Sequence, residues 1–222
     1  MRNAVSKSSP ASARSGGSAS DTAIIGALAK VAHAAGVPLI VDNTVPSPYL
    51  LRPIEHGADI VVHSLTKYLG GHGNSVGGAI VDSGKFPWAE HKARFPRLNE
   101  PDVSYHGVVY TEALGPAAFI GRARVVPLRN TGAALAPLNA FLILQGIETL
   151  ALRMDRICDN TLAIAKYLQS HPKVEWVRYA GLPDHPDHAL VQRQSGGKAS
   201  GILSFGVKNS DADPRAAGAR FL

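Results

Sequence analysis

The sequence predicts an α/β fold that continues into the start of a smaller α+β domain. Three short apolar runs, at 37–43, 58–64 and 77–83, are rich in Val and Ile and do not alternate with polar residues. Such runs are typical of strands buried on both faces. A helical pattern precedes the first run and a short turn separates it from the second, as in sheets layered with helices. The third run follows without a helix, so a different strand direction is possible there.

The first helix is expected to begin at Asp21 and to end at Gly36. Asp is a good N-cap, apolar residues recur with helical spacing from Ile24 to Ala35, and Pro38 follows the glycine. Residues 1–20 are dominated by Ser, Ala and Gly. This composition predicts a disordered leader.

The second half of the chain reads as irregular, then helical, then mixed. Residues 84–135 are rich in Pro, His and Arg and predict long loops with short helices. Helical periodicity returns from Pro137 to Leu168, where Gly146 breaks or joins two helices. Strands are expected at 174–179 and 201–207, a loop-rich stretch at 181–200, and a new helix at 214–222. These patterns divide the chain into a leader at 1–20, a first domain at 21–148, and a helix with the start of a second domain at 149–222.

Composition excludes several classes of function. The 222 residues include 45% hydrophobic and 18% charged residues, with a formal net charge of +6. The basic residues are spread out and not interleaved with aromatic residues, which favours a solvated surface over a nucleic-acid site. No apolar run approaches the length of a membrane span. Cys158 is the only cysteine; we interpret it as a buried structural thiol in a protein of a reducing compartment, the cytoplasm.

The stretch 63-HSLTKYLGGHG-73 carries the candidate chemistry. Asp42 ends the first predicted strand and Lys67 follows the second, so both are expected at the carboxyl edge of the sheet, where open α/β sheets bind ligands. A lysine can bond covalently to an aldehyde cofactor, Ser64 and Thr66 can bind phosphate, and an aspartate can pair with a protonated pyridine nitrogen. From spacing alone, a solvated loop lysine beside two turn-capping hydroxyls remains an alternative. A P-loop is a poor rival, because its Gly–Lys–Ser/Thr order is missing.

The run at 41–88, with 129–154 and 171–186, resembles the cofactor-attachment region of the Cys/Met-metabolism family of fold-type I pyridoxal phosphate (PLP) enzymes. Within the family it is most similar to the O-acetylhomoserine sulfhydrylase branch, from about residue 22 to 221. The resemblance implies that Lys67 is the covalent anchor and later moves protons. It also implies that Asp42 pairs with the pyridine nitrogen and that Ser64 and Thr66 bind the phosphate.

The resemblance further implies a γ-replacement on O-acetylhomoserine, in which sulfide or methanethiol gives homocysteine or methionine. Cystathionine γ-synthase or γ-lyase and O-succinylhomoserine sulfhydrylase share the lysine motif and stay open as alternatives. The resemblance also implies a homotetrameric assembly. A non-catalytic remnant is the alternative from another class.

Family members are longer than this chain, so we expect it to be truncated at both ends and to hold a partial central sheet. The resemblance then implies that 21–148 is the C-terminal part of the PLP-binding large domain and that 149–222 is a linking helix with an incomplete C-terminal domain. The phosphate-cradling helix N-terminus, the ring-stacking tyrosine and the arginine that binds the substrate carboxylate match no residue here. Around the motif, we interpret His63 as a packed histidine rather than a catalyst and His72 as a structural hydrogen-bonding residue. Asn43 and Thr44 are expected to orient Asp42.

Overall fold

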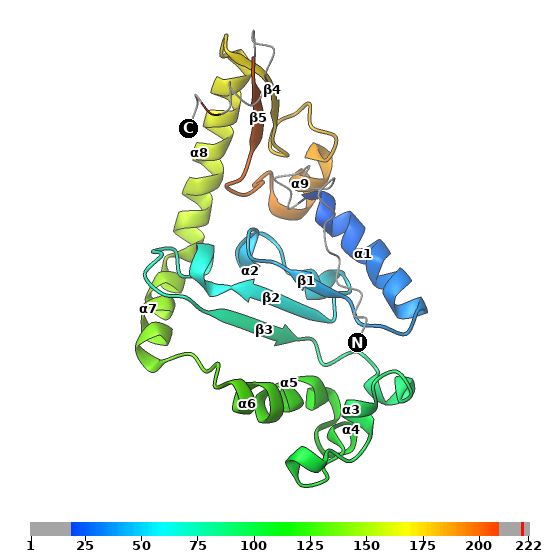
Figure 1. Cartoon of the computed structure of the whole chain (residues 1–222). Helices are drawn as coiled ribbons and strands as arrows, with labels where there is room; N and C mark the ends of the chain where they lie inside the picture. Colours follow the sequence, from blue (N-terminus) through cyan, green and yellow to red (C-terminus); the bar gives the residue numbers. More distant parts are fainter. Residues whose placement is uncertain (1–18, 209–218, 220–222) are drawn as a thin grey trace. The chain divides into compact units, whose positions relative to one another are not determined.

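A computed structural model describes residues 19–208 and 219 of the chain (Figure 1). The chain divides into two compact units. The described part of the first unit consists of Ile25–Thr44 and Pro53–Ile147, and the second consists mainly of Val45–Arg52 and the chain from Glu148 onward. Most of the predicted leader and of the predicted helix at 214–222 lie outside the described residues. The predicted domain boundary after residue 148 stays a prediction.

A three-stranded sheet forms the centre of the first unit. Its strands are β1 (Ile40–Asp42), β2 (Ile60–Ser64) and β3 (Gly78–Asp82), in the order β1-β2-β3. β1 and β2 are parallel, with Ile40 opposite Ile60 and Asp42 opposite Val62. β3 is antiparallel to β2, because only a turn and a glycine-rich loop connect them. Each of the three apolar runs therefore contains a strand. The third strand runs in the opposite direction, as the sequence allowed because no helix precedes it.

Helix α1 (Ala19–Ala34) precedes the sheet. It begins two residues before Asp21, so the prediction of Asp21 as the N-cap was wrong. Its end is as predicted: Gly36 adopts a φ of +65°, a conformation that glycine tolerates best. The helix buries Ile25, Ala29 and Ala32, which recur at the spacing of one helical face.

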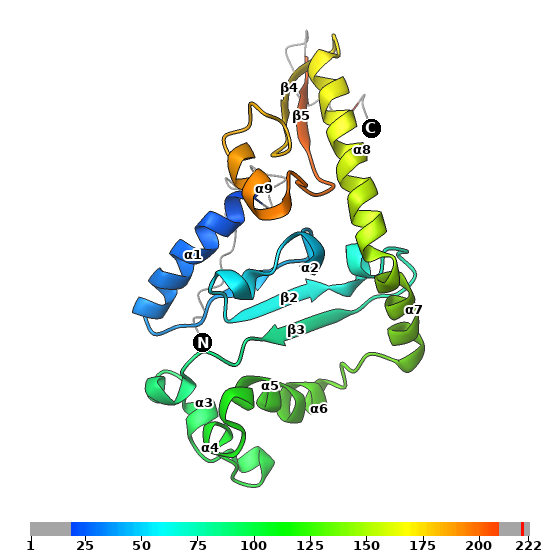
Figure 2. The same ribbon diagram turned by 180° about the vertical axis from the view of Figure 1, so that it is seen from behind.

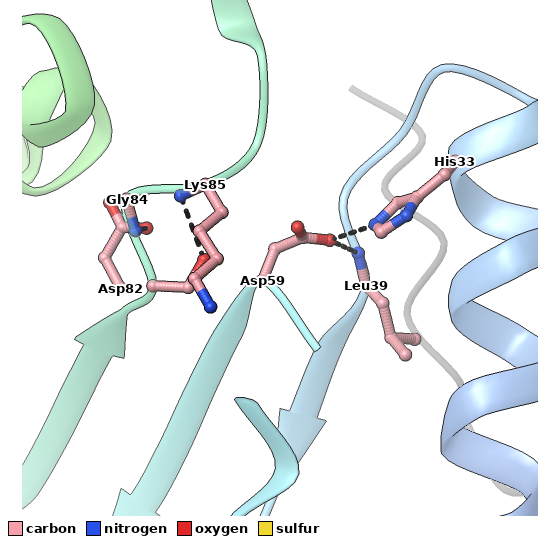
Figure 3. Close-up of polar contacts among 7 residues, drawn as sticks. His33, Leu39, Asp59, Asp82, Gly84 and Lys85 are labelled. Carbon is pink, nitrogen blue, oxygen red and sulfur yellow. Dashed lines mark hydrogen bonds and ion pairs between the residues drawn. The ribbon is translucent and has the colours of Figure 1, made fainter. Parts of the chain in front are cut away.

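A buried carboxylate joins α1 to the sheet (Figure 3). Asp59, which precedes β2, is only 4% exposed. One of its oxygens, Oδ2, lies 2.8 Å from His33 Nε2 of α1 and accepts a 2.8 Å hydrogen bond from the Leu39 amide. Burying an unpaired carboxylate is costly, so these two contacts fix the position of α1 against the start of β1.

The predicted irregular middle consists of short helices packed around an aromatic core. These helices are α3 (Pro96–Asn99), α4 (Tyr110–Leu114), α5 (Ala118–Ala123) and α6 (Arg129–Thr131), with a π-helical turn at Arg124–Leu128. Tyr110 and Ala118 are almost fully buried with Ile60 of β2. The rings of Trp88 and Phe119 stack with their centroids 5.6 Å apart. Aromatic packing thus replaces long helices in holding this segment.

Helix α7 (Pro137–Glu148) completes the first unit, and helix α8 (Leu150–Ser170) belongs to the second. Thr149 separates them, whereas the sequence placed the break or joint at Gly146. Gly146 lies inside α7 with no room for a side chain, because a Cβ there would overlap the Gly70 carbonyl. The glycine is explained by this close approach of two backbones.

The second unit packs α8 beside a two-stranded antiparallel sheet, β4 (Val174–Arg178) and β5 (Ser204–Val207) (Figure 2). Helices α2 (Ser47–Leu50) and α9 (His188–Ser195) also belong to it. The strands confirm the prediction, but α9 lies in a stretch predicted as loop-rich. Cys158 of α8 is 4% exposed, as predicted for a structural thiol.

An ionic cluster ties three segments of the second unit together. Lys198 forms an ion pair with Asp155 of α8, and the Tyr49 hydroxyl donates a 2.7 Å hydrogen bond to the same carboxylate. The lysine also lies over the Tyr49 ring, 5.3 Å from its centroid. None of the helices that the structure describes is long and apolar enough to cross a membrane.

We predict that Gly146→Ala destabilises the first unit, because the new methyl group must displace the Gly70 backbone. Overpacking of this kind costs about 1–3 kcal/mol. Gly26→Ala is the matched control, since a Cβ in that helix meets nothing closer than 3.7 Å. It should instead stabilise by about 0.5–1 kcal/mol through helix propensity. Urea unfolding of both variants checks this, and equal shifts would contradict the close-packing argument.

A second prediction concerns Asp82, at the end of β3. Burial raises the pKa of its carboxyl group above the usual 3.8, and the charge of Asp59 adds to the shift. The folded state therefore binds the proton more tightly, and stability falls as pH rises from about 3.8 through the raised pKa. Asp82→Asn removes this penalty, while the amide oxygen can still accept the 2.9 Å bond from Gly84 shown in Figure 3. The unfolding free energy of the variant minus that of the parent should therefore be larger at pH 7 than at pH 3.5.

Asp102→Asn provides a control of opposite sign. Hydrogen bonds from Ser104, above all that from its hydroxyl, lower the pKa of the Asp102 carboxyl, and the Tyr110 hydroxyl adds to this. Its charged form therefore favours folding above pH 3.8, and the Asn variant should lose stability at pH 7 relative to pH 3.5. Denaturant titrations at the two pH values measure both differences. If this difference changed with pH in the same direction for both variants, the opposite pKa shifts of Asp82 and Asp102 would be wrong.

Candidate active site at the carboxyl ends of strands β1 and β2

The parallel pairing of β1 and β2 brings the predicted site residues to one edge of the sheet. Asp42 is the last residue of β1 and Ser64 is the last of β2. A π-helical turn, Leu65–Leu69, follows at once and carries Thr66 and Lys67. The four residues named from the sequence therefore come from two adjacent strand ends and a single turn.

Thr44 links the two strand ends through its hydroxyl group. The hydroxyl donates a 2.6 Å hydrogen bond to Asp42 Oδ1, and the Thr44 amide donates a second one of 3.0 Å to the same oxygen. The hydroxyl also accepts a 2.8 Å hydrogen bond from the backbone amide of Ser64. Because the hydroxyl that binds Asp42 also accepts from the Ser64 amide, the orientation of Asp42 is tied to the backbone of the neighbouring strand.

Lys67 is exposed and lies where the backbone leaves helical geometry. Its φ and ψ are −87° and −129° inside the π-helical turn. The Lys67 carbonyl accepts a 2.7 Å hydrogen bond from the amide of Gly71, whose φ is +72°. A glycine at 71 thus allows the chain to reverse and close the turn behind the lysine.

The two hydroxyl residues differ in what they contact. Thr66 Oγ1 accepts a 3.1 Å hydrogen bond from the Gly77 amide and lies 3.4 Å from the Gly77 carbonyl oxygen. The second contact is beyond the usual range of an O–H···O bond, so the proton can turn to another acceptor at little cost. Ser64 is half-buried and makes no capping hydrogen bond with its side chain. Phosphate binding by Ser64 and Thr66 stays a prediction.

The histidines of the motif have structural surroundings. His63 is only 8% exposed. Burial lowers the pKa of its imidazole, while the backbone of Asn43 and the charge of Asp42 oppose the shift. A neutral, packed ring fits the interpretation of His63 as a non-catalytic residue. His72 Nδ1 lies 2.7 Å from the Gly70 carbonyl, which confirms a structural hydrogen bond in the glycine loop.

These residues fit PLP. The cofactor requires a lysine amine, an anionic partner for the pyridine nitrogen and donors for the phosphate. Lys67 is exposed, and Asp42 is also exposed, with the hydrogen bonds from Thr44 confined to one of its oxygens. Ser64 and Thr66 offer hydroxyl groups at the same edge. Among the described residues, no group of three or more His, Cys, Asp or Glu side chains could hold a metal ion.

Sequence reasoning named Thr44 only as a residue that orients Asp42 and missed its bond to Ser64. The Asp-x-Thr spacing is a signal for the local part, because an aspartate commonly accepts from the backbone two residues on. The contact across the strands has no local signal. The Gly77 partner of Thr66 was missed for the same reason.

We predict that Thr44→Val loosens the strand ends, because the Ser64 amide loses its acceptor. The cost should be about 1–2 kcal/mol of unfolding free energy. Thr44→Ser keeps the hydroxyl and should retain most of the stability. Hydrogen exchange at the Ser64 amide is the local measurement: it should be faster in the Val variant and near the parent rate in the Ser variant. Equal exchange in both would show that the hydroxyl does not link the strands.

Known proteins resemble the chain in both sequence and structure. Homocysteine synthase of Schizosaccharomyces pombe is 52% identical over 189 residues, which are 85% of this chain and 44% of the relative. O-acetyl-L-homoserine sulfhydrylase of Leptospira meyeri is 50% identical over 197 residues, again 85% of this chain and 44% of the relative. The chain thus spans less than half the length of these relatives.

A solved structure resembles the chain in fold. A Campylobacter jejuni protein assigned as O-acetylhomoserine (thiol)-lyase, crystallised with a pyridoxyl-lysine monophosphate, superposes with a TM-score of 0.76 at 38% identity. The match covers 83% of this chain and 46% of that one. This likeness confirms the predicted fold-type I α/β architecture. The family profile described as Cys/Met metabolism PLP-dependent enzyme matches residues 18–220, and the chain therefore belongs to that family.

Proposed function

We propose that this chain supplies the lysine-bearing part of a PLP-dependent transferase that replaces the acetoxy group of O-acetylhomoserine with sulfide or methanethiol and releases acetate. The products would be homocysteine or methionine. The observation that carries the proposal is that Lys67 lies in the turn that directly follows β2, while Asp42 ends the neighbouring parallel strand β1. The names of the relatives, homocysteine synthase and O-acetyl-L-homoserine sulfhydrylase, support this substrate class.

The family resemblance implies a role for each residue in the proposal. Lys67 is the covalent anchor, and its exposed side chain then moves protons at the substrate carbons. Asp42 pairs with the pyridine nitrogen, and Thr44 holds the carboxylate in one orientation. Ser64 and Thr66 donate hydrogen bonds to the phosphate. When bound, PLP supplies the electron sink that stabilises a carbanion on the substrate.

His63 leaves the charge of Asp42 uncompensated. Burial keeps the pKa of the imidazole low, so the ring is neutral near pH 7. A protonated histidine at this place would pair with the Asp42 carboxylate and reduce its effect on the cofactor. A neutral ring leaves the negative charge of Asp42 available to the pyridine nitrogen.

The wider proposals concern location, domain division and assembly. We propose a cytoplasmic location, because a single buried cysteine without a disulfide framework suits a reducing compartment. The division into 21–148 and 149–222, and a homotetrameric assembly, are part of the proposal. Cystathionine γ-synthase chemistry is less favoured, since the relatives carry sulfhydrylase and homocysteine synthase names.

The anchor can be tested by chemical trapping. The chain is incubated with PLP, reduced with borohydride and digested, and the modified lysine is located by mass spectrometry. We expect modification of Lys67 in the parent and its loss in Lys67→Ala. Lys85→Ala is the matched control, because Lys85 is also an exposed lysine of the first unit.

Two results would count against the proposal. One is equal labelling of the parent and of Lys67→Ala, which would indicate non-specific reaction with surface lysines. The other is labelling of Lys67 that does not change in Asp42→Ala, because a bound cofactor should be held less tightly without its pyridine partner. If Lys67 is labelled as expected, the parent protein with PLP and without borohydride is assayed for production of homocysteine from O-acetylhomoserine and sulfide. This assay tests the substrate class.

A further inference from the structure

The backbone that carries Asp42 and Thr44 continues directly into a segment of the second unit. Thr44 ends a stretch of the first unit, and Val45–Arg52, which follows at once, belongs to the second. This segment contains α2, which buries Ser47 and Leu50. The residues of the candidate site are therefore joined by the covalent backbone to a short helix whose packing belongs to the other unit.

Three side chains of the second unit hold α2, and we call them the Tyr49 cluster. The Tyr49 hydroxyl donates a 2.7 Å hydrogen bond to Asp155 of α8. Lys198 forms an ion pair with the same carboxylate and donates a 3.3 Å hydrogen bond to the Tyr49 oxygen. Hydrogen bonds from Lys198, and after it from Tyr49, lower the pKa of the Asp155 carboxyl, so it is charged near pH 7. One exposed ion pair contributes little by itself, but here the charges, the hydroxyl and the ring all act on one side chain.

Ser47 lies between the site and the Tyr49 cluster in a strained backbone conformation. Its φ is +57°, in the left-handed region, and the residue is completely buried. Residues other than glycine rarely adopt this region, and a residue before a proline, as Ser47 is before Pro48, favours extended backbone. Such conformations persist only where the surrounding structure holds them. The chain on each side of Ser47 therefore prevents it from relaxing.

The connection from Ser47 back to the site is short and stiff. Only Val45 and Pro46 separate Ser47 from Thr44. The φ of Pro46 is −65°, and the proline ring does not let it change. Few bonds can thus absorb a rotation at Ser47 before it reaches Thr44, whose hydroxyl binds the Asp42 carboxylate.

We propose that the Tyr49 cluster is a positioning device for the candidate site. By holding Tyr49 it keeps Ser47 in the strained conformation, and it thereby keeps the Thr44 hydroxyl between the two strand ends. Without the cluster, Ser47 relaxes, Thr44 moves and the carboxylate of Asp42 loses its fixed direction. The consequence for the pyridine nitrogen rests on the proposed function, whereas the movement of Thr44 does not.

Hydrogen exchange of the parent and of Asp155→Ala tests the coupling without cofactor. The Ser64 amide, which donates to the Thr44 hydroxyl, should exchange about threefold faster or more in the variant. The Ile60 amide, at the other end of β2, should keep its rate. A cluster that only stabilises the second unit would change neither rate.

Asp159→Ala is the matched control, because Asp159 is an exposed acid of the same helix, one turn further on. It should change the Ser64 rate by less than about twofold, as is usual for surface substitutions. Unfolding midpoints near that of the parent show that both variants are folded.

Ser47→Gly tests whether the strain is the connection. Glycine adopts a positive φ without strain, so the backbone at 47 has nothing to relax when the cluster is lost. In the double variant with Asp155→Ala, the Ser64 amide should exchange within about twofold of its rate in Ser47→Gly alone. The glycine therefore rescues the loss of the carboxylate.

PLP affinity gives a second readout, which rests on the proposed function. In a titration followed by visible absorption, Asp155→Ala should raise the dissociation constant of PLP by about threefold or more, and Asp159→Ala by less than about twofold. If the parent binds no PLP at Lys67, the proposed function fails, and the exchange rates still decide the positioning role.

Three exchange results would overturn the proposal. The first is an unchanged Ser64 rate in Asp155→Ala; faster exchange of the Leu51 amide alone, which donates to the Ser47 carbonyl, would limit the cluster to stabilising α2. The second is equal acceleration of the Ser64 and Ile60 amides, which would indicate general loosening of the sheet. The third is a Ser64 rate in Asp155→Ala that Ser47→Gly does not lower, which would show that strain is not the connection.

Discussion

The hydroxyl group of Thr44 is the point at which the two strands of the candidate site are joined. It donates to Asp42 Oδ1 and accepts from the Ser64 amide, so the carboxylate and the start of the lysine turn move as one body. The parallel register of β1 and β2 places both residues at one edge. Without this bridge the strands would still pair, and the Thr44 amide would still bind the carboxylate, but no side chain would connect the carboxylate to the start of the lysine turn.

A second constraint is the packing of helix α7 against the glycine loop that follows the lysine turn. Gly70 ends the lysine turn, and its carbonyl leaves no space for a Cβ at Gly146 of α7. Ile143, one helical turn earlier, fills the space beside Gly77, the partner of Thr66. Helix α7 therefore supports both ends of the glycine loop, and the backbone around Lys67 is fixed on two sides by residues far away in the sequence.

Much of the architecture could be predicted from local patterns. The apolar runs gave the three strands, Gly36 gave the end of α1, and the motif led to Asp42, Ser64, Thr66 and Lys67, which the structure brings to one edge. Features set by distant contacts could not be predicted. Gly146 reads locally as a helix breaker, Asp21 reads as a cap inside a longer helix, and α9 was missed because only Val191 of its residues is buried.

The buried thiol of α8 has a consequence for how the second unit can be observed. Cys158 is the sole cysteine of the chain, it is 4% exposed, and burial raises the pKa of its thiol. Only the thiolate reacts readily with alkylating reagents, so modification requires the unit to open. The rate at which a thiol reagent labels the native protein therefore reports how often the packing around Cys158 in the second unit opens.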